Sequence, residues 1–254
     1  MNAEIVRITE NGESLIEDAC RCCYQSYHRK NPPESTAKLI QHVLKEGHFS
    51  VLEHATVTFK ITGVSRALTH ELVRHRLFSF SQESQRYVNY CDLPATNQPG
   101  QKGKSRKKTK DFSYFTPLDI AESEDLSFQE KWDTETPINN SERGWITIPP
   151  PIYNYHRIVD LCYKYYEFLL SKGIKPEDAR YILPNATCSD IYVTGNVRTW
   201  RHFIQLRCHP RAMEEIRLLA TQIKNTLINR LPNCFFDYKL GALTEEDYKE
   251  IVIT

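Results

Sequence analysis

The chain has 254 residues, of which 40% are hydrophobic and 26% are charged, and its formal net charge is +1 at pH 7. This composition is typical of a globular protein with a sizeable core, and the near-zero charge excludes a surface that binds polyanions everywhere, so any anion site must be local. No run of about 18 apolar residues and no secretory signal pattern is present, so we expect a cytoplasmic protein without a membrane partner, whose eight cysteines are thiols.

The first predicted elements are a strand and a cysteine-rich helix. Residues 3–10 (AEIVRITE) have the composition of a strand. In residues 13–27 the apolar side chains recur at helical spacing, Cys20 and Cys23 among them. The CRCC stretch could instead bind a metal, but its spacing is not that of a paired zinc site. Free cysteine behaves as a small apolar side chain, so buried helix thiols are the better interpretation and no metal is predicted.

A helix, a strand and a second helix follow. Residues 35–48 predict a helix that begins at a Ser-Thr cap and ends at a glycine. Residues 55–62 (ATVTFKIT) alternate between apolar and polar side chains, which predicts a half-buried strand. Residues 65–76 predict a short helix, and its last residues, Arg74–Arg76, place cations at the negative end of the helix dipole.

Residues 91–145 differ from the rest of the chain. Their first part is basic and turn-rich, and their second part is acidic and weakly periodic. We interpret them as an insertion within a single domain that spans residues 1–254. The basic run at 102–110 could be a nucleic-acid arm. No aromatic residue alternates with its lysines to stack on bases, so a solvated loop is the better interpretation and nucleic acid is not expected as a partner.

The remainder of the chain is predicted to be mainly helical. Apolar positions at helical spacing indicate helices at 153–174, 175–184, 196–210 and 210–231. The second of these begins with a proline in the first turn, where proline is favoured.

Arginines gather in four short stretches: RHR at 74–76, SQR at 84–86, DAR at 178–180 and NVRTWRHFIQLR at 196–207. Each arginine could be a surface side chain or half of a salt bridge. That interpretation is weaker for Arg198 and Arg207, which lie in apolar helices. Guanidinium groups suit phosphate groups and carbonyl edges, and Tyr87 and Trp200 could supply faces for a flat ring.

The spacing between two of these stretches resembles the signature of a known protein family. Arg74-His75-Arg76, seven further residues and Ser84 form the pattern R-H-R-x7-S, which resembles the signature of the flavin-dependent thymidylate synthases. The stretches SVLEHATVTF, DARYILP and NVRTWRHFIQLR resemble the same family. The resemblance covers residues from about 1 to 90 and from 145 to 235, and the insertion has no counterpart.

This resemblance implies an α/β fold of the α+β type, with a helix-flanked, mainly antiparallel sheet, a largely helical second half and a homotetramer whose active sites are shared between subunits. It also implies the conversion of dUMP to dTMP with FAD as cofactor. The cosubstrates would be 5,10-methylenetetrahydrofolate as carbon donor and NADPH as reductant.

The resemblance also assigns site residues by position. It implies that dUMP contacts Glu71, Leu72, Val73, Arg74, Gln82, Glu83, Ser84, Gln85, Arg86, Arg180 and Arg207. It implies that FAD contacts Thr56, Arg74, His75, Arg76, Gln82, Asn196, Val197, Arg198, His202 and Arg207, with His54 near the flavin ring. Position 83 is commonly apolar in the family, so we expect Glu83 to contact the nucleotide through its backbone only.

The resemblance implies no enzyme nucleophile. The catalytic role is assigned to Arg207, which would stabilise negative charge on the uracil as N3 ionises. Ser84 and Cys208 are alternative nucleophiles. No general base is fixed beside Ser84 in the sequence, and Cys208 is better interpreted as a buried thiol at a helix end.

Overall fold

The computed structural model describes residues 1–90, 113–117, 128–129, 138–140, 144–146, 152–153, 155–244, 246–247 and 251. Most of the predicted insertion, including the basic run at 102–110, lies outside these residues. The chain divides into two compact units, one of residues 1–83, 113–115 and 186–254, and one of residues 84–112 and 116–185. The single domain predicted for the whole chain stays a prediction.

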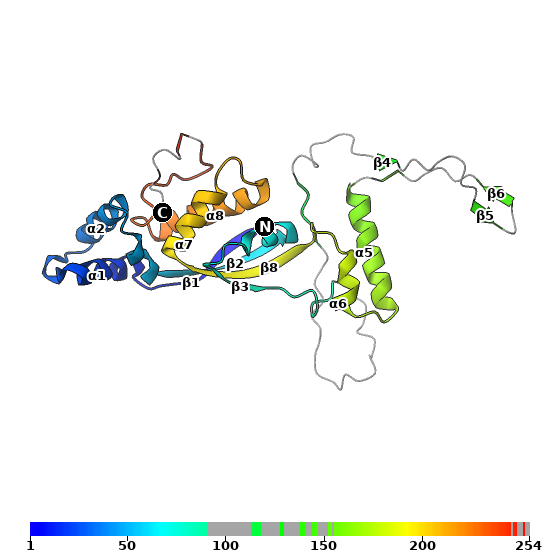
Figure 1. Cartoon of the computed structure of the whole chain (residues 1–254), viewed down its shortest axis with the longest axis horizontal. Helices are drawn as coiled ribbons and strands as arrows, with labels where there is room; N and C mark the ends of the chain where they lie inside the picture. Colours follow the sequence, from blue (N-terminus) through cyan, green and yellow to red (C-terminus); the bar gives the residue numbers. More distant parts are fainter. Residues whose placement is uncertain are drawn as a thin grey trace, which may run out of the picture. The chain divides into compact units, whose positions relative to one another are not determined.

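The first unit is built on a four-stranded antiparallel sheet with the order β1-β2-β8-β3 (Figure 1). Its strands are β1 Asn2–Ile8, β2 Thr56–Ser65, β3 Ser79–Gln82 and β8 Cys188–Asn196. On β2, Val57, Phe59 and Ile61 are buried, while Thr58 and Lys60 on the other face are half-buried. The alternation predicted from the sequence is therefore confirmed.

Helices cover the apolar face of this sheet, where α7 and α8 lie across the strands (Figure 1). The helical elements of the first unit are α1 Gly12–Tyr24, η1 Tyr27–Arg29, α2 Glu34–Lys45, η2 Phe49–His54, α3 Arg66–Leu72, α7 Val197–Arg207 and α8 Glu214–Arg230. Trp200 of α7 is fully buried against Phe59, with ring centroids 4.9 Å apart, and donates to the Val57 carbonyl. The mixed α/β fold with a small antiparallel sheet is thus confirmed.

Three local predictions need correction. The strands β3 and β8 are absent from the sequence prediction, in which no helix or strand covers residues 77–90 or 186–195. Pro33, and not Ser35 or Thr36, is the N-cap residue of α2. The helix predicted over 65–76 ends at Leu72, so the arginines that follow it lie beyond its last turn.

The burial predicted for the thiols of the cysteine-rich helix α1 is only partly confirmed. Cys20 is buried, and burial raises the pKa of its thiol to about 11. Cys22 and Cys23 are exposed, so the buried position predicted for Cys23 is wrong. Among the described residues, no group of His, Cys, Asp or Glu side chains could hold a metal ion.

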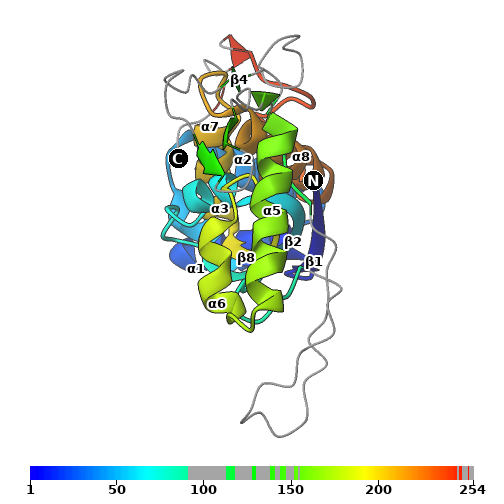
Figure 2. The same ribbon diagram turned by 90° about the vertical axis from the view of Figure 1, so that its right-hand side faces the viewer.

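The second unit contains α5 Tyr155–Ser171, α6 Pro176–Ala179 and the short helix η3 Arg180–Ile182. Figure 2 shows α5 and α6 side by side. Tyr90, Tyr166 and Ala179 form the buried centre of a small core. Four short strands pair as β4 Phe128–Gln129 with β7 Ile152–Tyr153, and β5 Ile138–Asn140 with β6 Gly144–Ile146.

No helix in the described part of the chain is both long enough and apolar enough to cross a membrane.

Candidate active site

Arg207 is held by two acceptors that come from α3 and the turn after it. Its Nε donates to His75 Nε2 at 2.9 Å, and its Nη1 lies 2.8 Å from Glu71 Oε2. Arg207 is the last residue of α7, and Asn196 caps the first turn of this helix by accepting from the Thr199 N–H at 2.8 Å. Its Nη2 has no hydrogen-bond partner among the described residues, so the N–H groups of this nitrogen are available to a ligand.

The electrostatics of this cluster favour a neutral His75. Burial, the positive charge of Arg207 and the neighbouring His202 together lower the pKa of His75 to about 4. The ring can then accept from Arg207 at neutral pH, because the acceptor nitrogen carries no proton. Glu71 supplies the only opposite charge paired with Arg207 in the described structure, and both side chains remain partly exposed.

Two further cations lie on the turn that carries His75. Arg74 and Arg76 are exposed, and neither has a side-chain partner among the described residues. Unpaired arginines on both sides of His75 are available to an anion without first breaking an ion pair. The sequence prediction of a local concentration of free positive charge is therefore supported.

Three of the predicted flavin contacts line one cavity. This cavity has a volume of about 440 Å³ and is lined by Asn196, Arg198 and His202 together with Glu53, Leu77 and Thr199. Arg198 Nη1 lies 2.6 Å from Glu53 Oε1, and both side chains are nearly half exposed. Exposed pairs of this kind contribute about 0–1 kcal/mol, so an incoming phosphate could replace the carboxylate.

Other predicted flavin contacts lie outside this cavity. Thr56 shares hydrogen bonds with Thr9, and His54 is exposed at the end of η2. Val197 is fully buried and its N–H donates to the Ala55 carbonyl, so its side chain is not available to a ligand. Gln82 donates to Thr69 Oγ1 and Ser189 Oγ, which fixes its amide within the sheet region.

In the second unit, two predicted phosphate ligands meet at one residue. Arg86 donates to the Glu177 carboxylate at 3.0 and 3.2 Å, and Arg180 Nε donates to the Glu177 carbonyl at 3.1 Å. The bond to Glu177 raises the pKa of Arg86, which stays charged. Arg86 and Arg180 are far apart in sequence, so their shared partner supports a common anion site.

Gln85 and Glu83, which lie close to Arg86 in the sequence, differ in whether their N–H groups have hydrogen-bond partners. Gln85 is buried, and its Nε2 has no hydrogen-bond partner among the described residues. A buried donor without an acceptor is costly, and a ligand oxygen would satisfy it. The backbone N–H of Glu83 donates to the Asp190 carbonyl, so it is not available for the backbone contact expected with the nucleotide.

Two predicted contacts near Arg74 and the two predicted stacking surfaces differ in their exposure. Leu72 is fully buried, whereas Val73 is 41% exposed on the turn. Trp200 is also fully buried, so it has no face available for a flat ligand, in contrast to the sequence prediction. Tyr87 is 66% exposed and could still provide one.

Neither alternative nucleophile has the surroundings it needs. Cys208 is buried after the end of α7, and burial raises the pKa of its thiol to about 11, which leaves almost no thiolate at neutral pH. Ser84 Oγ accepts from the Arg86 N–H and has no His or carboxylate partner among the described residues. The structure supports the non-covalent interpretation.

Sequence reasoning missed several residues that the structure places beside the predicted ones. Glu53 pairs with Arg198, and Glu177 with Arg86. Glu53 lies in the SVLEHATVTF stretch noted for its resemblance, and Glu177 directly precedes DARYILP, but a carboxylate is hard to recognise as part of an anion site. The sequence analysis also does not include Leu77. In the structure this apolar side chain is 76% exposed beside three basic residues, which suggests a contact with a ligand or a subunit.

Comparisons with known proteins match this chain to one family. Residues 4–233 match the family model Thy1, described as thymidylate synthase complementing protein. A flavin-dependent thymidylate synthase from Mycobacterium sp. (strain JLS) is 37% identical over 238 residues, which cover 93% of this chain and 84% of that protein.

Two solved structures share the fold. Thymidylate synthase X (ThyX) from Helicobacter pylori, crystallised with FAD and dUMP, matches with a TM-score of 0.63 and 22% identity, over 93% of this chain and 98% of that one. The UMP/dUMP methylase PolB from Streptomyces cacaoi, bound with 5-Br dUMP, matches with a TM-score of 0.65 and 22% identity, over 99% and 97%. On the sequence matches, this chain belongs to the flavin-dependent thymidylate synthase family.

Proposed function

We propose that this chain converts dUMP to dTMP, with FAD as its cofactor and Arg207 as the residue that activates the uracil. The observation that carries the proposal is the position of Arg207, which a neutral His75 and the Glu71 carboxylate hold while its Nη2 has no partner among the described residues. The carbon donor would be 5,10-methylenetetrahydrofolate and the reductant NADPH. The assembly would be a homotetramer in the cytoplasm.

The residues present fit a flavin dinucleotide. Arg74 and Arg76 are free cations for its phosphate groups, and the cavity lined by Asn196, Arg198 and His202 offers further donors. When bound, FAD supplies the redox chemistry that reduces the transferred one-carbon unit to a methyl group. Asn196 also caps α7, so its side chain is fixed by the Thr199 N–H.

The residues also fit a nucleotide monophosphate. Arg86 and Arg180 would hold the phosphate, and Glu177 orients both of them. The buried Gln85 amide would find its missing acceptor on the same ligand. Ser84 would add a neutral hydroxyl donor.

Arg207 would act on the pyrimidine edge. A guanidinium keeps its charge at all physiological pH values and presents parallel donors, so it favours the ring that has lost its N3 proton. His75 and Glu71 reduce the rotational freedom of Arg207, which lowers the cost of presenting those donors. The neutral state of His75 also avoids a second positive charge against Arg207.

Two measurements test the proposal. The purified protein should be yellow, and its absorbance near 450 nm should bleach on addition of NADPH. With methylenetetrahydrofolate present, dUMP should yield dTMP, and UMP serves as the comparison substrate because a structural neighbour acts on both. A colourless protein that binds nucleic acid with steep salt dependence would contradict the proposal.

A further inference from the structure

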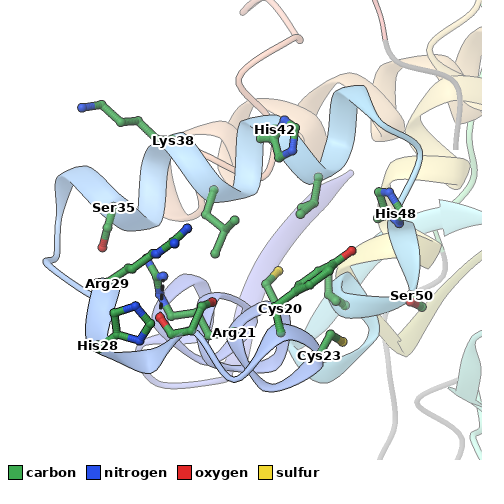
Figure 3. A pocket seen from close by; sticks show the side chains of 15 residues that line it. Cys20, Arg21, Cys23, His28, Arg29, Ser35, Lys38, His42, His48 and Ser50 are labelled. Atoms are coloured by element: carbon green, nitrogen blue, oxygen red, sulfur yellow. Dashed lines mark hydrogen bonds between the residues drawn. The ribbon is translucent and has the colours of Figure 1, made fainter.

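A second cavity in the first unit lies among residues to which no role has been assigned. It has a volume of about 760 Å³ and opens between α1, η1, α2 and the start of η2 (Figure 3). This volume is within the range of small-molecule sites, roughly 300–1,000 Å³. Leu39, Val43 and Val51 give it an apolar wall.

The polar part of this cavity is basic. Its lining includes Arg21, Arg29 and Lys38 together with three histidines, and no aspartate or glutamate within the described part of the chain lines it. Arg21 is already neutralised, because its guanidinium lies 2.6 Å from the buried Glu17 carboxylate. On a chain with a net charge of only +1, a lining of this composition is a local excess of positive charge.

The two other cations have no such partner. Arg29 and Lys38 make no ion pair and no side-chain hydrogen bond with any described residue. Their neighbour Lys30, which does not line the cavity, is paired with Asp18 at 2.6 Å. Acidic side chains in this region therefore neutralise cations other than Arg29 and Lys38.

Figure 3 shows how the basic side chains are arranged. Arg29 reaches into the space between α1 and α2 with His28 beside it, while Lys38 extends from the outer side of α2. His48 lies at the opposite end, near Ser50. A ligand that fills this cavity would place anionic groups near Arg29 and a flatter, less polar part toward η2.

The η2 segment connects this cavity with the proposed flavin site. His48 precedes η2 and Ser50 lies within it, and both line the larger cavity, while Glu53 of the same short helix lines the cavity assigned to FAD. A molecule in the larger cavity would therefore lie against the segment that also forms a wall of the flavin cavity.

We propose that this cavity binds the phosphate groups of the dinucleotide reductant, NADPH, with Arg29 as the main contact and Lys38 at the rim. The inference rests on the proposed function. Of the anionic ligands in that reaction, dUMP and FAD have other residues assigned to them, which leaves NADPH and the glutamyl carboxylate of the folate. Phosphate groups at more than one position of a ligand match a cavity with two unpaired cations better than a charge at one end of the folate.

The experiment compares two double variants of the full-length, FAD-loaded enzyme. Arg29→Gln/Lys38→Gln removes the two unpaired cations of the cavity. Lys30→Gln/Lys45→Gln removes two positive charges from the same segments, at positions that do not line it. Both variants have the same net charge, so a difference between them reports local contacts and not the long-range field.

Direct binding of NADP⁺ by calorimetry and the NADPH dependence of flavin bleaching are the two measurements of the reductant. In the cavity variant we expect the Kd for NADP⁺ and the half-saturating NADPH concentration to rise about 10-fold or more, with less than a twofold change in the control. Flavin content, the rate at saturating NADPH and the half-saturating folate concentration should match the parent.

Three outcomes would overturn the inference: unchanged NADPH dependence, a shift in the folate dependence instead, or altered assembly of the cavity variant in size-exclusion chromatography. The last would identify the cavity as a subunit contact. Failure of the proposed function is distinguishable from all three, because the parent enzyme itself would then be colourless or form no dTMP.

Discussion

Arg207 Nε donates a hydrogen bond to His75 Nε2 at 2.9 Å, so the histidine must present an unprotonated nitrogen to a permanent cation. Burial and the charge of Arg207 lower the pKa of His75 to about 4. The unfolded chain would bind a proton at His75 near pH 6.5, whereas the folded chain would not. The unfolded state therefore binds more protons between these two values, and stability falls as the pH decreases through this window.

The variant that tests this pH dependence is His75→Gln, because the side-chain oxygen of glutamine can accept from Arg207 but does not titrate. We expect the melting temperature of the parent to fall more steeply than that of the variant between pH 6.5 and about pH 4, with parallel curves above pH 7. Identical profiles across the whole range would mean that protonation of His75 is not coupled to folding.

Arg74→Ala should weaken the binding of both FAD and dUMP, because Arg74 is assigned to both anions and has no competing partner among the described residues. Loss of a charge-assisted hydrogen bond costs about 1.5–3 kcal/mol. Equilibrium dialysis of FAD and calorimetry of dUMP on the reloaded enzyme measure the two effects. Arg211→Ala, also exposed but outside the assigned residues, is the control, and dUMP affinity within twofold of the parent would contradict the assignment.

Much of the first unit could be predicted from periodicity. The alternation of residues 55–62 fixed which face of β2 is buried, and the helical spacing in 196–210 identified α7. Strand β8 is not predicted although Ile191 and Val193 are buried and Tyr192 between them is exposed, because this short alternating segment lies between the helical patterns of residues 175–184 and 196–210. The edge strand β3 has only four residues, which is too short for a reliable period.

The site could be predicted only where a motif brought residues together in sequence. R-H-R-x7-S led to Arg74, His75 and Arg76, but not to the contact between His75 and Arg207, which are 132 positions apart. The prediction of Trp200 as a possible ligand surface is wrong, because its burial depends on the packing of α7 against β2, which the sequence does not show. The neutral state of His75 likewise arises from tertiary burial and a distant charge.

Gly195→Ala should destabilise the first unit although the added group is a single methyl. A Cβ at this position would lie 2.4 Å from the ring of Phe78, which packs against Trp200 with centroids 4.4 Å apart. The ring would have to shift within a filled core, at a cost of about 1–3 kcal/mol. Thermal unfolding measures the loss, and Ser81→Ala on the exposed face of β3 is the control.

The mechanism of this destabilisation has its own test. If Phe78 is the obstacle, Phe78→Leu should destabilise the parent but recover part of the loss in the Gly195→Ala background. Strictly additive losses in the double variant would show that the methyl group acts elsewhere.

Cys208→Ala should retain turnover. The thiol is buried, and its pKa of about 11 leaves it protonated at neutral pH. Removal of the sulfur creates a small cavity beneath α7, so a modest fall in melting temperature is expected. The measurement is dTMP formation per bound flavin, and a loss of several hundredfold with the flavin content intact would restore the covalent alternative.

Arg207→Lys tests the electrostatic mechanism most directly. Lysine keeps a positive charge but loses the planar fork, so it would not present parallel donors to the pyrimidine edge while also bonding to His75 and Glu71. We expect a fall in turnover of roughly 10²-fold or more, because removal of one oriented donor at a site of developing charge has effects of this size. Ser84→Ala, which removes one neutral hydroxyl, should lose less turnover.

Arg207 is also an assigned FAD contact, so each variant is first saturated with flavin and its melting temperature is compared with that of the parent. Turnover of dUMP to dTMP at saturating dUMP is then measured per bound flavin, and a near-parental value for Arg207→Lys would rule out the proposed role of the guanidinium.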